Sequence, residues 1–434
     1  MSSTEIIAVN GRRVWDSRGR PTVEAEIRLE GGFVGRAMAP AGASRGSNEA
    51  IDLRDGGEAF GGLGVDQAVS NVNTAIAKAL TGRDVNDQQD IDNAMIQLDG
   101  TPNKASLGGN ATVAVSMAAA HAAAASCGLP LWRYLAGDTV PNLPLPQVQI
   151  FGGGAHAGRR VDVQDFLVMP VGAKTLDQAF VWIAEVYRAA GELMDEAGSL
   201  AGVADEGGWW PDFSSNEAAL EMLVRAIERA GLTPGDEMAI ALDIAASEFA
   251  TASGYRLALE DREIDSDGLI DMLTDWIERY PIASIEDAVA EDDTDGMIKF
   301  TRAVGDRIQV IGDDYLVTNA GRIDEASAAG ACNAVLLKPN QAGTLSETKA
   351  ALEAARKHGW GTVVSARSGE TEDPTVTHLA IGWNAGQLKV GSFARSERMV
   401  KWNEALRIEA ELGREAHFVG GAALRNAADE VKDI

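Results

Sequence analysis

Six short apolar segments in the second half of the chain each carry a charged or hydroxyl residue at or near their end. The segments read MAIALDI, PIASIED, IQVIGDD, NAVLLKPN, GTVVSAR and GQLKVGS. Their polar residues are, in chain order, Asp243, Glu286, Asp313, Lys338, Ser365 with Arg367, and Lys389. If these segments are parallel strands of one barrel, their carboxyl ends all open on the same face. We therefore expect carboxylates, ammonium groups and a guanidinium to meet in one site.

The three acidic residues, Asp243, Glu286 and Asp313, predict a metal site. Hard carboxylate oxygens without a nearby His or Cys favour Mg²⁺ over zinc. The alternative is that each acidic residue only caps the helix that follows its strand. Three successive acidic strand ends, followed by a lysine at the next one, favour the metal site.

The lysine at the fourth segment predicts the reaction type. A lysine buried among cations and apolar walls has a destabilised ammonium, so Lys338 can act as a base. A divalent ion beside it can hold a substrate carboxylate and stabilise the dianion that forms when the adjacent carbon loses a proton. The inventory therefore predicts proton abstraction next to a carboxylate.

The spacing of the segments indicates the scaffold that positions them. They recur roughly every 25 to 45 residues, the length of one strand–helix unit, and such tandem units favour a parallel barrel. The proline-rich stretch GDTVPNLPLPQVQ reads as the crossing between two domains. We therefore predict an α/β chain with one domain at residues 1–138 and a barrel domain at 139–434.

The first domain is predicted to mix strands and helices. The stretch TVEAEIRLEGGFVGRA alternates apolar and charged residues, which is typical of an antiparallel hairpin with one solvent-exposed face. Apolar residues recur at helical spacing from Val65 to Leu80, and ATVAVSMAAAHAAAASCG predicts a closely packed alanine-rich helix. His121 on that helix is interpreted as an ordinary helical residue rather than a ligand.

Composition excludes several classes of function. The 434 residues carry a net charge of −27, spread along the chain, so a nucleic acid would be repelled. Two distant cysteines predict neither a disulfide framework nor a zinc site and suit a reducing compartment. No apolar run approaches about 18 residues, so we expect no membrane span. The start lacks a signal-peptide pattern, and we expect a cytoplasmic protein.

Long ordered motifs make the chain resemble the enolase family over nearly its whole length. They are WDSRGRPTVEAEI, GASRGSNEA, ADEGGWWPD, LDIAASEF, SIEDAVAEDD, GDDYLVTN, LLKPNQAGTLSET, SARSGETED and GQLKVGSFARSER. The resemblance implies an N-terminal α+β capping domain followed by an enolase-type (β/α)8 barrel. It also implies two Mg²⁺ ions, the second dependent on substrate.

The same resemblance implies a role for each matching residue. The first Mg²⁺ would be held by Asp243, Glu286 and Asp313, and the second would meet Ser44 in a mobile loop. Catalysis would involve Lys338 as the base, Glu206 assisting the departing hydroxide, and Asp165 as the partner of Glu206. Substrate contacts would come from His156, Gln164, Ser365, Arg367 and Lys389. The substrate would be a small phosphorylated or phosphonylated carboxylic acid, and the assembly a homodimer or an octamer.

Several positions around the predicted pocket depart from the family pattern. Ala366 stands where the family has a histidine, and Asp165 stands where it has a glutamate. The loop AGASRG replaces the usual SGASTG and brings in Arg45, and the stretch IFGGGAH before His156 lacks the usual asparagine. Trp209 and Trp210 replace small residues.

These departures favour a specialised member of the family. Such variants form carboxyphosphonoenolpyruvate in phosphonate and phosphinate biosynthesis, and Arg45 could meet the extra anionic group of that product. The tandem tryptophans could stack on a bulky substrate, although packing of their own loop is favoured. Two alternatives stay open. One is an ordinary enolase that converts 2-phosphoglycerate to phosphoenolpyruvate, and the other is a non-catalytic binding or structural protein.

Overall fold

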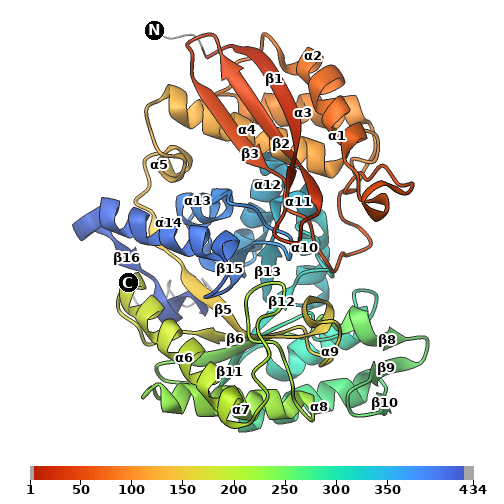
Figure 1. Cartoon of the computed structure of the whole chain (residues 1–434), viewed down its shortest axis with the longest axis vertical. Coiled ribbons are helices and arrows are strands. Elements are labelled where there is room, and N and C mark those ends of the chain that lie inside the picture. Colours follow the sequence, from red (N-terminus) through yellow and green to blue (C-terminus); the bar gives the residue numbers. More distant parts are fainter. Residues whose placement is uncertain (1–3, 425–434) are drawn as a thin grey trace.

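A three-stranded antiparallel sheet and a group of helices form the first part of the computed structural model, which describes residues 4–424 (Figure 1). The sheet order is β1-β2-β3, with β1 at Ile6–Trp15, β2 at Pro21–Leu29 and β3 at Val34–Met38. The helical elements are η1 (Ala59–Gly62), α1 (Asp66–Asn71), η2 (Val72–Ile76), α2 (Ala77–Leu80), α3 (Gln88–Asp99), α4 (Gly109–Ser126) and α5 (Leu131–Ala136). This α+β part stands above the barrel as a cap.

The predicted hairpin is present, and Arg28 and Arg36 on its charged face are exposed, but the two glutamates of that face are buried. Glu24 and Glu26 of β2 are only 4% and 3% exposed. Because β2 is the central strand, arginines on both neighbours cover these carboxylates: Arg12 Nη1 lies 3.0 Å from Glu24 Oε1, and Arg36 Nη2 lies 2.9 Å from Glu26 Oε2. The alternation therefore separates an apolar face from a layer of ion pairs whose carboxylates are buried and whose arginines are about half exposed.

The predicted alanine-rich helix, α4, packs against β2 and β3. The backbone of α4 approaches β3 so closely at Gly35 that no side chain fits there. A Cβ added at Gly35 would lie 2.1 Å from Ala118 O and 2.2 Å from Ala122 N. The helix predicted from Val65 to Leu80 is also present, as α1, the π-helical turn η2 and α2 in succession.

Eight strands close into a barrel in the order β11-β12-β13-β14-β15-β5-β6-β7. Their bounds are β5 Leu145–Gly152, β6 Asp165–Met169, β7 Ala239–Asp243, β11 Ile282–Glu286, β12 Gln309–Gly312, β13 Ala334–Leu337, β14 Gly361–Ser365 and β15 Gly386–Ser392. One strand departs from the predicted all-parallel arrangement: β6 pairs antiparallel with both β5 and β7. The first residue of β6, Asp165, therefore lies at the barrel end where the other strands finish.

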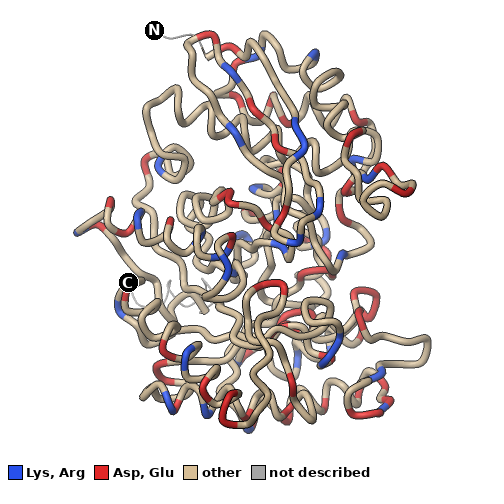
Figure 2. Tube along the Cα trace, viewed as in Figure 1, with Lys and Arg blue, Asp and Glu red and all other residues tan. Residues whose placement is uncertain are grey.

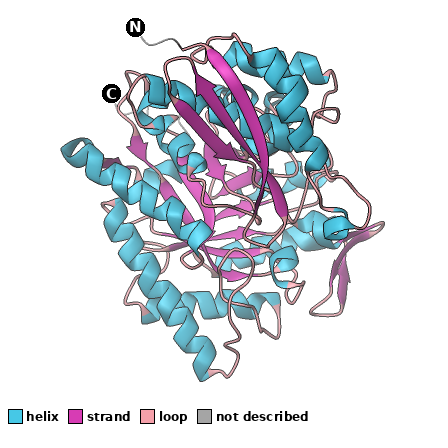
Figure 3. Cartoon of the chain, turned by 45° about the horizontal axis from the view of Figure 1, so that its top comes forward, coloured by secondary structure: helices cyan, strands magenta, loops and turns pink. Residues whose placement is uncertain are grey.

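Helices surround the barrel strands (Figure 3). They are η3 (Gly154–Ala157), α6 (Leu176–Glu196), α7 (Asn216–Arg229), η4 (Ala246–Phe249), α8 (Ser266–Arg279), α9 (Thr294–Val304), α10 (Ala320–Ala329), α11 (Pro339–Ala342), α12 (Leu345–Lys357), α13 (Thr375–Gly382), α14 (Ser396–Leu412), η5 (Gly413–Glu415) and η6 (Gly420–Leu424). A small sheet of β8 (Ala250–Thr251), β9 (Gly254–Leu257) and β10 (Arg262–Ile264) projects from the barrel, and β4 (Asn142–Leu143) pairs with β16 (His417–Phe418).

The strand register gathers polar residues at one end of the barrel. Asp243 pairs with Asp165 on one side and with Glu286 on the other. Ser365 pairs with Lys389, which lies inside β15 rather than at its end, where the sequence placed it. Neighbouring strands therefore carry the predicted site residues side by side.

Charged residues are distributed along the whole described trace, as Figure 2 shows. Within residues 4–424 no helix has the length and apolar character needed to cross a bilayer. The domain boundary between residues 138 and 139 stays a proposal. The outer ends of the two predicted domains, residues 1–3 and 425–434, lie outside the described part of the chain.

Candidate active site

A small pocket opens at the end of the barrel where the predicted site residues meet. Its lining is almost wholly polar and comes from both parts of the chain: Ser44, His156, Gln164, Asp165, Glu206, Asp243, Lys338, Ser365, Ala366, Arg367, Ser368, Lys389 and Gly391. Of the residues selected from the sequence, Glu286, Asp313 and Arg45 do not line this pocket.

Lys389 links three carboxylates on adjacent strands. Its Nζ lies 2.7 Å from Glu286 Oε2, 3.0 Å from Asp243 Oδ2 and 3.4 Å from Asp165 Oδ2. Burial lowers the pKa of Lys389, but Asp243 and Glu286 outweigh that effect and raise the pKa well above its usual value. Lys389 is therefore a fixed positive charge at the centre of the acidic group.

Lys338 is paired in the same way with Asp313, whose carboxylate accepts a short hydrogen bond from the lysine Nζ. Burial lowers the pKa of Lys338, yet the carboxylate of Asp313 more than offsets it, and the pKa is raised. The sequence prediction of a destabilised ammonium is wrong for this arrangement, since the expected cationic neighbours count for less than one directly bonded carboxylate.

A second polar group joins His156 to two carboxylates. His156 Nδ1 lies 3.0 Å from Asp165 Oδ1, and Nε2 lies 3.7 Å from Glu206 Oε1. Burial lowers the pKa of His156, but Glu206 and Asp165 outweigh it and raise the pKa to about 9. The imidazole is therefore protonated near neutral pH and lies between the two acids.

The loop after β14 brings Arg367 and Ser368 to the pocket. The Ser368 hydroxyl lies 3.0 Å from His156 Nε2. The Arg367 guanidinium donates to Glu49 and to the backbone oxygen of Ser44, so it also fixes the loop that carries Ser44. By contrast, the Ser365 hydroxyl lines the pocket but donates to the adjacent carbonyl of Ala366.

Comparison with known proteins covers nearly the whole chain. The family model described as "Enolase, N-terminal domain" matches residues 6–135, and that described as "Enolase, C-terminal TIM barrel domain" matches residues 140–427. A relative named "Enolase 1", from Desulfitobacterium hafniense (strain Y51), is 50% identical over 421 residues, which are 96% of each chain. The chain belongs to the enolase family. It is a hydro-lyase of the enolase superfamily with the barrel fold predicted from its sequence.

The enolase family generally uses Mg²⁺, and the donor set of this chain fits that ion. Asp243, Glu286 and Asp313 are all at most 4% exposed. Burial and the neighbouring charge of Asp243 raise the pKa of Glu286 well above its usual value. Glu286 Oε1 is buried and has no hydrogen-bond partner within the described residues. An unpartnered carboxylate oxygen in an all-oxygen donor set suits a hard dication.

The three predicted ligands do not form a tight cluster here. The groups in residues 4–424 whose ligand atoms all lie within 4.8 Å are His156 with Asp165 and Glu206, and Asp287 with Asp313 and Asp314. Lys389 holds Asp243 and Glu286, while Lys338 holds Asp313. Each of the three predicted ligands is therefore paired with a lysine through one of its carboxylate oxygens.

Asp287 and Asp314 escaped the sequence reasoning, although each directly follows a selected acid. Asp287 accepts the backbone N–H groups of Asp313 and Asp314, at 2.9 and 2.8 Å, and so shapes the turn after β12. Burial first, and then the charge of Asp313, raises the pKa of Asp287 to about 8 and that of Asp314 to about 9. The doubled acids in IED and GDD are the signal that could have found them.

Ser368 and Glu49 were missed as well. Ser368 stands in the quoted motif SARSGETED, but the hydroxyl of Ser365 was selected in its place. Glu49 stands in GASRGSNEA and pairs with Arg367 at 3.0 Å across the two domains. Position along a strand identifies which segment reaches the site, but not that the Ser368 hydroxyl, rather than that of Ser365, contacts His156.

Of the residues that depart from the family pattern, some line the pocket and others lie outside it. Ala366, 6% exposed, and Asp165 line the pocket. Arg45 lies 3.7 Å from Asp52 with its side chain 45% exposed. Trp209 stacks on Tyr187 at 4.7 Å and donates to the Tyr187 carbonyl, so it packs against α6, as the favoured interpretation predicts.

Proposed function

We propose that this enzyme dehydrates 2-phosphoglycerate to phosphoenolpyruvate. The observation that carries the proposal is the composition of the pocket, which has Lys338 and Lys389 together with the pair Glu206 and His156 around one space. An amine base and an acid that serve the same substrate are what a stepwise removal of water requires. The name of the relative, Enolase 1, supports the same reaction.

The first half of the proposed reaction breaks the C2–H bond. Lys338 would accept this proton at Nζ, for which it must be released from Asp313 and be neutral. Mg²⁺ held by Asp243, Glu286 and Asp313 would supply stabilisation of the carboxylate dianion. Lys389 would add its fixed positive charge to the substrate carboxylate, and Gln164 would line the same wall.

The second half breaks the C3–O bond as the C2=C3 double bond forms. The departing hydroxide needs a proton to leave as water, and Glu206, protonated before this step, would donate it. His156, positively charged between Glu206 and Asp165, would stabilise the Glu206 carboxylate that remains after the proton transfer and the negative charge that develops on the departing oxygen. Arg367, Ser368 and Ser365 would receive the phosphate, and Ser44 would close over it.

Formation of carboxyphosphonoenolpyruvate, which the departures from the family pattern favoured, ranks below dehydration of 2-phosphoglycerate. Arg45 pairs with Asp52 and Trp209 packs on Tyr187, and neither residue lines the pocket. Ala366 and Asp165 remain as the observations that favour a modified substrate, so carboxyphosphonoenolpyruvate synthesis ranks second. The non-catalytic alternative ranks last, because the pocket contains both the base and the acid.

Turnover of purified protein tests the proposal. With Mg²⁺ and 2-phosphoglycerate, we expect phosphoenolpyruvate to accumulate, measured by its ultraviolet absorbance, and chelation of the metal to stop it. Lys338→Ala is the control that removes the base. C2 proton exchange in heavy water without dehydration would favour the second candidate. If the protein shows neither exchange nor turnover, a binding role would be favoured.

Assembly and location are part of the proposal. We infer a homodimer or an octamer in the cytoplasm from the resemblance alone. Sedimentation velocity of the purified protein distinguishes a monomer, a dimer and an octamer, and a monomer would contradict this inference.

A further inference from the structure

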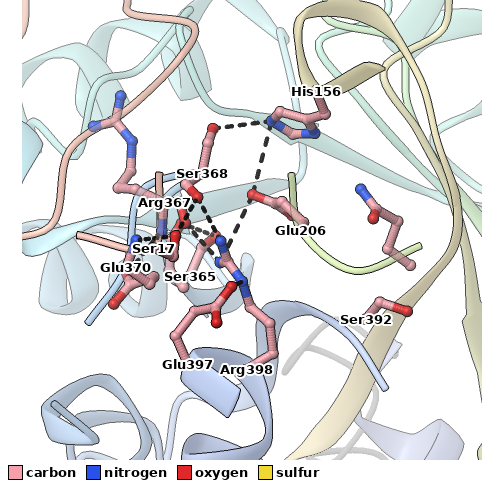
Figure 4. Close-up of polar contacts among 12 residues, drawn as sticks. Ser17, His156, Glu206, Ser365, Arg367, Ser368, Glu370, Ser392, Glu397 and Arg398 are labelled. Atoms are coloured by element: carbon pink, nitrogen blue, oxygen red, sulfur yellow. Dashed lines mark hydrogen bonds and ion pairs between the residues drawn. The ribbon is translucent and has the colours of Figure 1, made fainter. Parts of the chain in front are cut away.

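A fully buried arginine on α14 contacts both halves of the proposed site. Arg398 has no exposed surface, and its side chain crosses from α14 to the loop after β14 (Figure 4). Arg398 Nη1 donates to the Arg367 carbonyl at 2.7 Å, and Nη2 donates to the Ser368 carbonyl at 2.5 Å. Two successive carbonyls are thus held by one planar fork, which a lysine cannot reproduce.

Fixing these carbonyls fixes the side chains of the same residues. With its carbonyl turned to α14, Ser368 presents its hydroxyl to His156, and Arg367 reaches Glu49 and the Ser44 carbonyl. The Arg367 backbone N–H is held from the other side by Glu370 at 3.0 Å. The loop therefore has one arrangement, and Arg398 contributes two of the hydrogen bonds that define it.

The same guanidinium also lies beside the proposed acid. Arg398 Nη1 is 4.0 Å from Glu206 Oε1, the oxygen that lies 3.7 Å from His156 Nε2. The backbone of Glu206 is held independently, since its carbonyl accepts from the Ser392 N–H at 2.9 Å. What Arg398 adds at Glu206 is therefore a fixed charge, not the position of the main chain.

Neighbouring residues restrict the guanidinium to this place. A Cβ added at Gly391 would lie 2.8 Å from Arg398 Cδ and 2.9 Å from the Glu206 carbonyl. The strand β15, the helix α14 and the loop that carries Glu206 therefore pack closely. Arg398 Nε makes no hydrogen bond within the described residues, and Glu397 Oε1 lies 3.5 Å from it as an ion pair. Glu397 is in turn bound by Arg395, which donates to the Ser17 carbonyl of the capping domain.

We propose that Arg398 is a positioning residue for the reaction, one that fixes the phosphate-binding loop through two carbonyls and places a permanent positive charge beside Glu206. The inference rests on the proposed function, because it names what organises the two halves of that site. It predicts separate effects on substrate affinity, through Arg367 and Ser368, and on turnover, through Glu206.

Two substitutions separate these effects. Arg398→Lys keeps a positive charge near Glu206 but loses the fork, so KM for 2-phosphoglycerate should rise about tenfold with a smaller loss in kcat. Arg398→Met loses both, and kcat should fall by about 100-fold in addition to the rise in KM.

Arg356 on α12, an exposed arginine, offers a control with the same pair of carbonyl contacts. It also donates to two successive carbonyls, those of Trp383 and Asn384, but these residues precede β15 at the opposite end of the barrel. Arg356→Met should lower the thermal midpoint without changing kcat or KM per folded molecule. If Arg398→Met and Arg398→Lys behave like Arg356→Met, Arg398 is only structural and the proposal is overturned.

Amide hydrogen exchange tests the loop without any substrate. Residues 366–371 should exchange at least tenfold faster in both Arg398 variants than in the wild type or in Arg356→Met. Unchanged exchange there would overturn the proposal even if activity falls. If the wild type does not dehydrate 2-phosphoglycerate, the proposed function fails, while the exchange measurement still decides whether Arg398 orders the loop.

Discussion

His156 Nδ1 lies 3.0 Å from Asp165 Oδ1, and the imidazole joins this carboxylate to Glu206 on its other side. The pair defines the electrostatics of one half of the pocket, because both partners are buried: His156 is 5% exposed and Asp165 is fully buried. The short Asp165 side chain still reaches the ring directly. An aspartate at this position is therefore long enough to contact His156.

Asp165→Asn should lower the pKa of His156 from about 9, because one of the two carboxylates that raise it is lost while burial still lowers it. We expect kcat for dehydration to fall by about 100-fold. The chain has five histidines, so NMR titration can follow the ring of His156, with His156→Gln used to assign it. An unchanged midpoint would show that Asp165 does not hold the charge of His156.

Lys389→Met should increase the Mg²⁺ affinity of the substrate-free protein. The ammonium holds oxygens of Asp243 and Glu286, so its removal frees two predicted ligands. A gain of about tenfold, equivalent to about 1.4 kcal/mol, is expected by calorimetry. Turnover should be lost at the same time. The control is Lys349→Met on the exposed face of α12, which should leave Mg²⁺ affinity unchanged. Weaker Mg²⁺ binding in Lys389→Met would argue against the metal site.

Glu26→Gln should reduce the stability of the folded chain at neutral pH. It should also make that stability depend less on pH in acid. Hydrogen bonds from Arg36 and then from Arg28 and Arg12 outweigh burial and hold the pKa of Glu26 at about 2 in the folded chain, against an ordinary value of 4.5. Stability from this carboxylate is thus fully present above pH 4.5 and is lost as the pH falls towards 2. The arginines are about half exposed, so about 1 kcal/mol is expected at neutral pH.

Glu24→Gln is the matched comparison, because burial raises the pKa of Glu24 despite Arg12 and Arg36. Its charged form is disfavoured in the folded chain, so this substitution should increase stability at neutral pH. Urea denaturation between pH 2 and pH 7 measures both variants. If the stabilities of the two variants changed with pH in the same way, the opposite pKa shifts of Glu24 and Glu26 would be contradicted.

Gly35→Ala should destabilise the cap severely. The new methyl group would lie 2.1 Å from Ala118 O, a backbone atom of α4 that cannot move alone. We expect a loss of about 3 kcal/mol, the upper part of the range for overpacking, by urea denaturation. Gly321→Ala in the first turn of α10 is the control, since an added Cβ meets only Asn319 Oδ1 at 3.3 Å. That substitution should be neutral or slightly stabilising.

The sequence was sufficient to predict the fold class and the set of side chains, and insufficient for their pairings. Apolar runs ending in Asp243, Glu286 and Ser365 are barrel strands, because a buried parallel strand leaves an uninterrupted apolar signal. Strand direction leaves no such signal, so the reversal of β6 was not predictable from its apolar pattern.

The pairing of charged side chains was the second feature that the sequence could not predict. The burial of Glu24 and Glu26 depends on arginines from two other strands, and alternation within one strand cannot report them. Likewise the raised pKa of Lys338 depends on one direct contact with Asp313, which lies 25 residues earlier in the chain. Contacts made by Arg398 were also invisible, because its segment ARSER reads as an ordinary polar helix start.

The reversal of β6 has an engineering consequence. Because β5 and β6 form a hairpin whose connection crosses the catalytic end of the barrel, His156 and Gln164 both belong to one short span, with Asp165 immediately after it. A single grafted segment between Gly153 and Gln164 would exchange this wall in one step, with no change to either lysine. Chimeras made by swapping this hairpin tip among homologues therefore offer a compact library for altering selectivity.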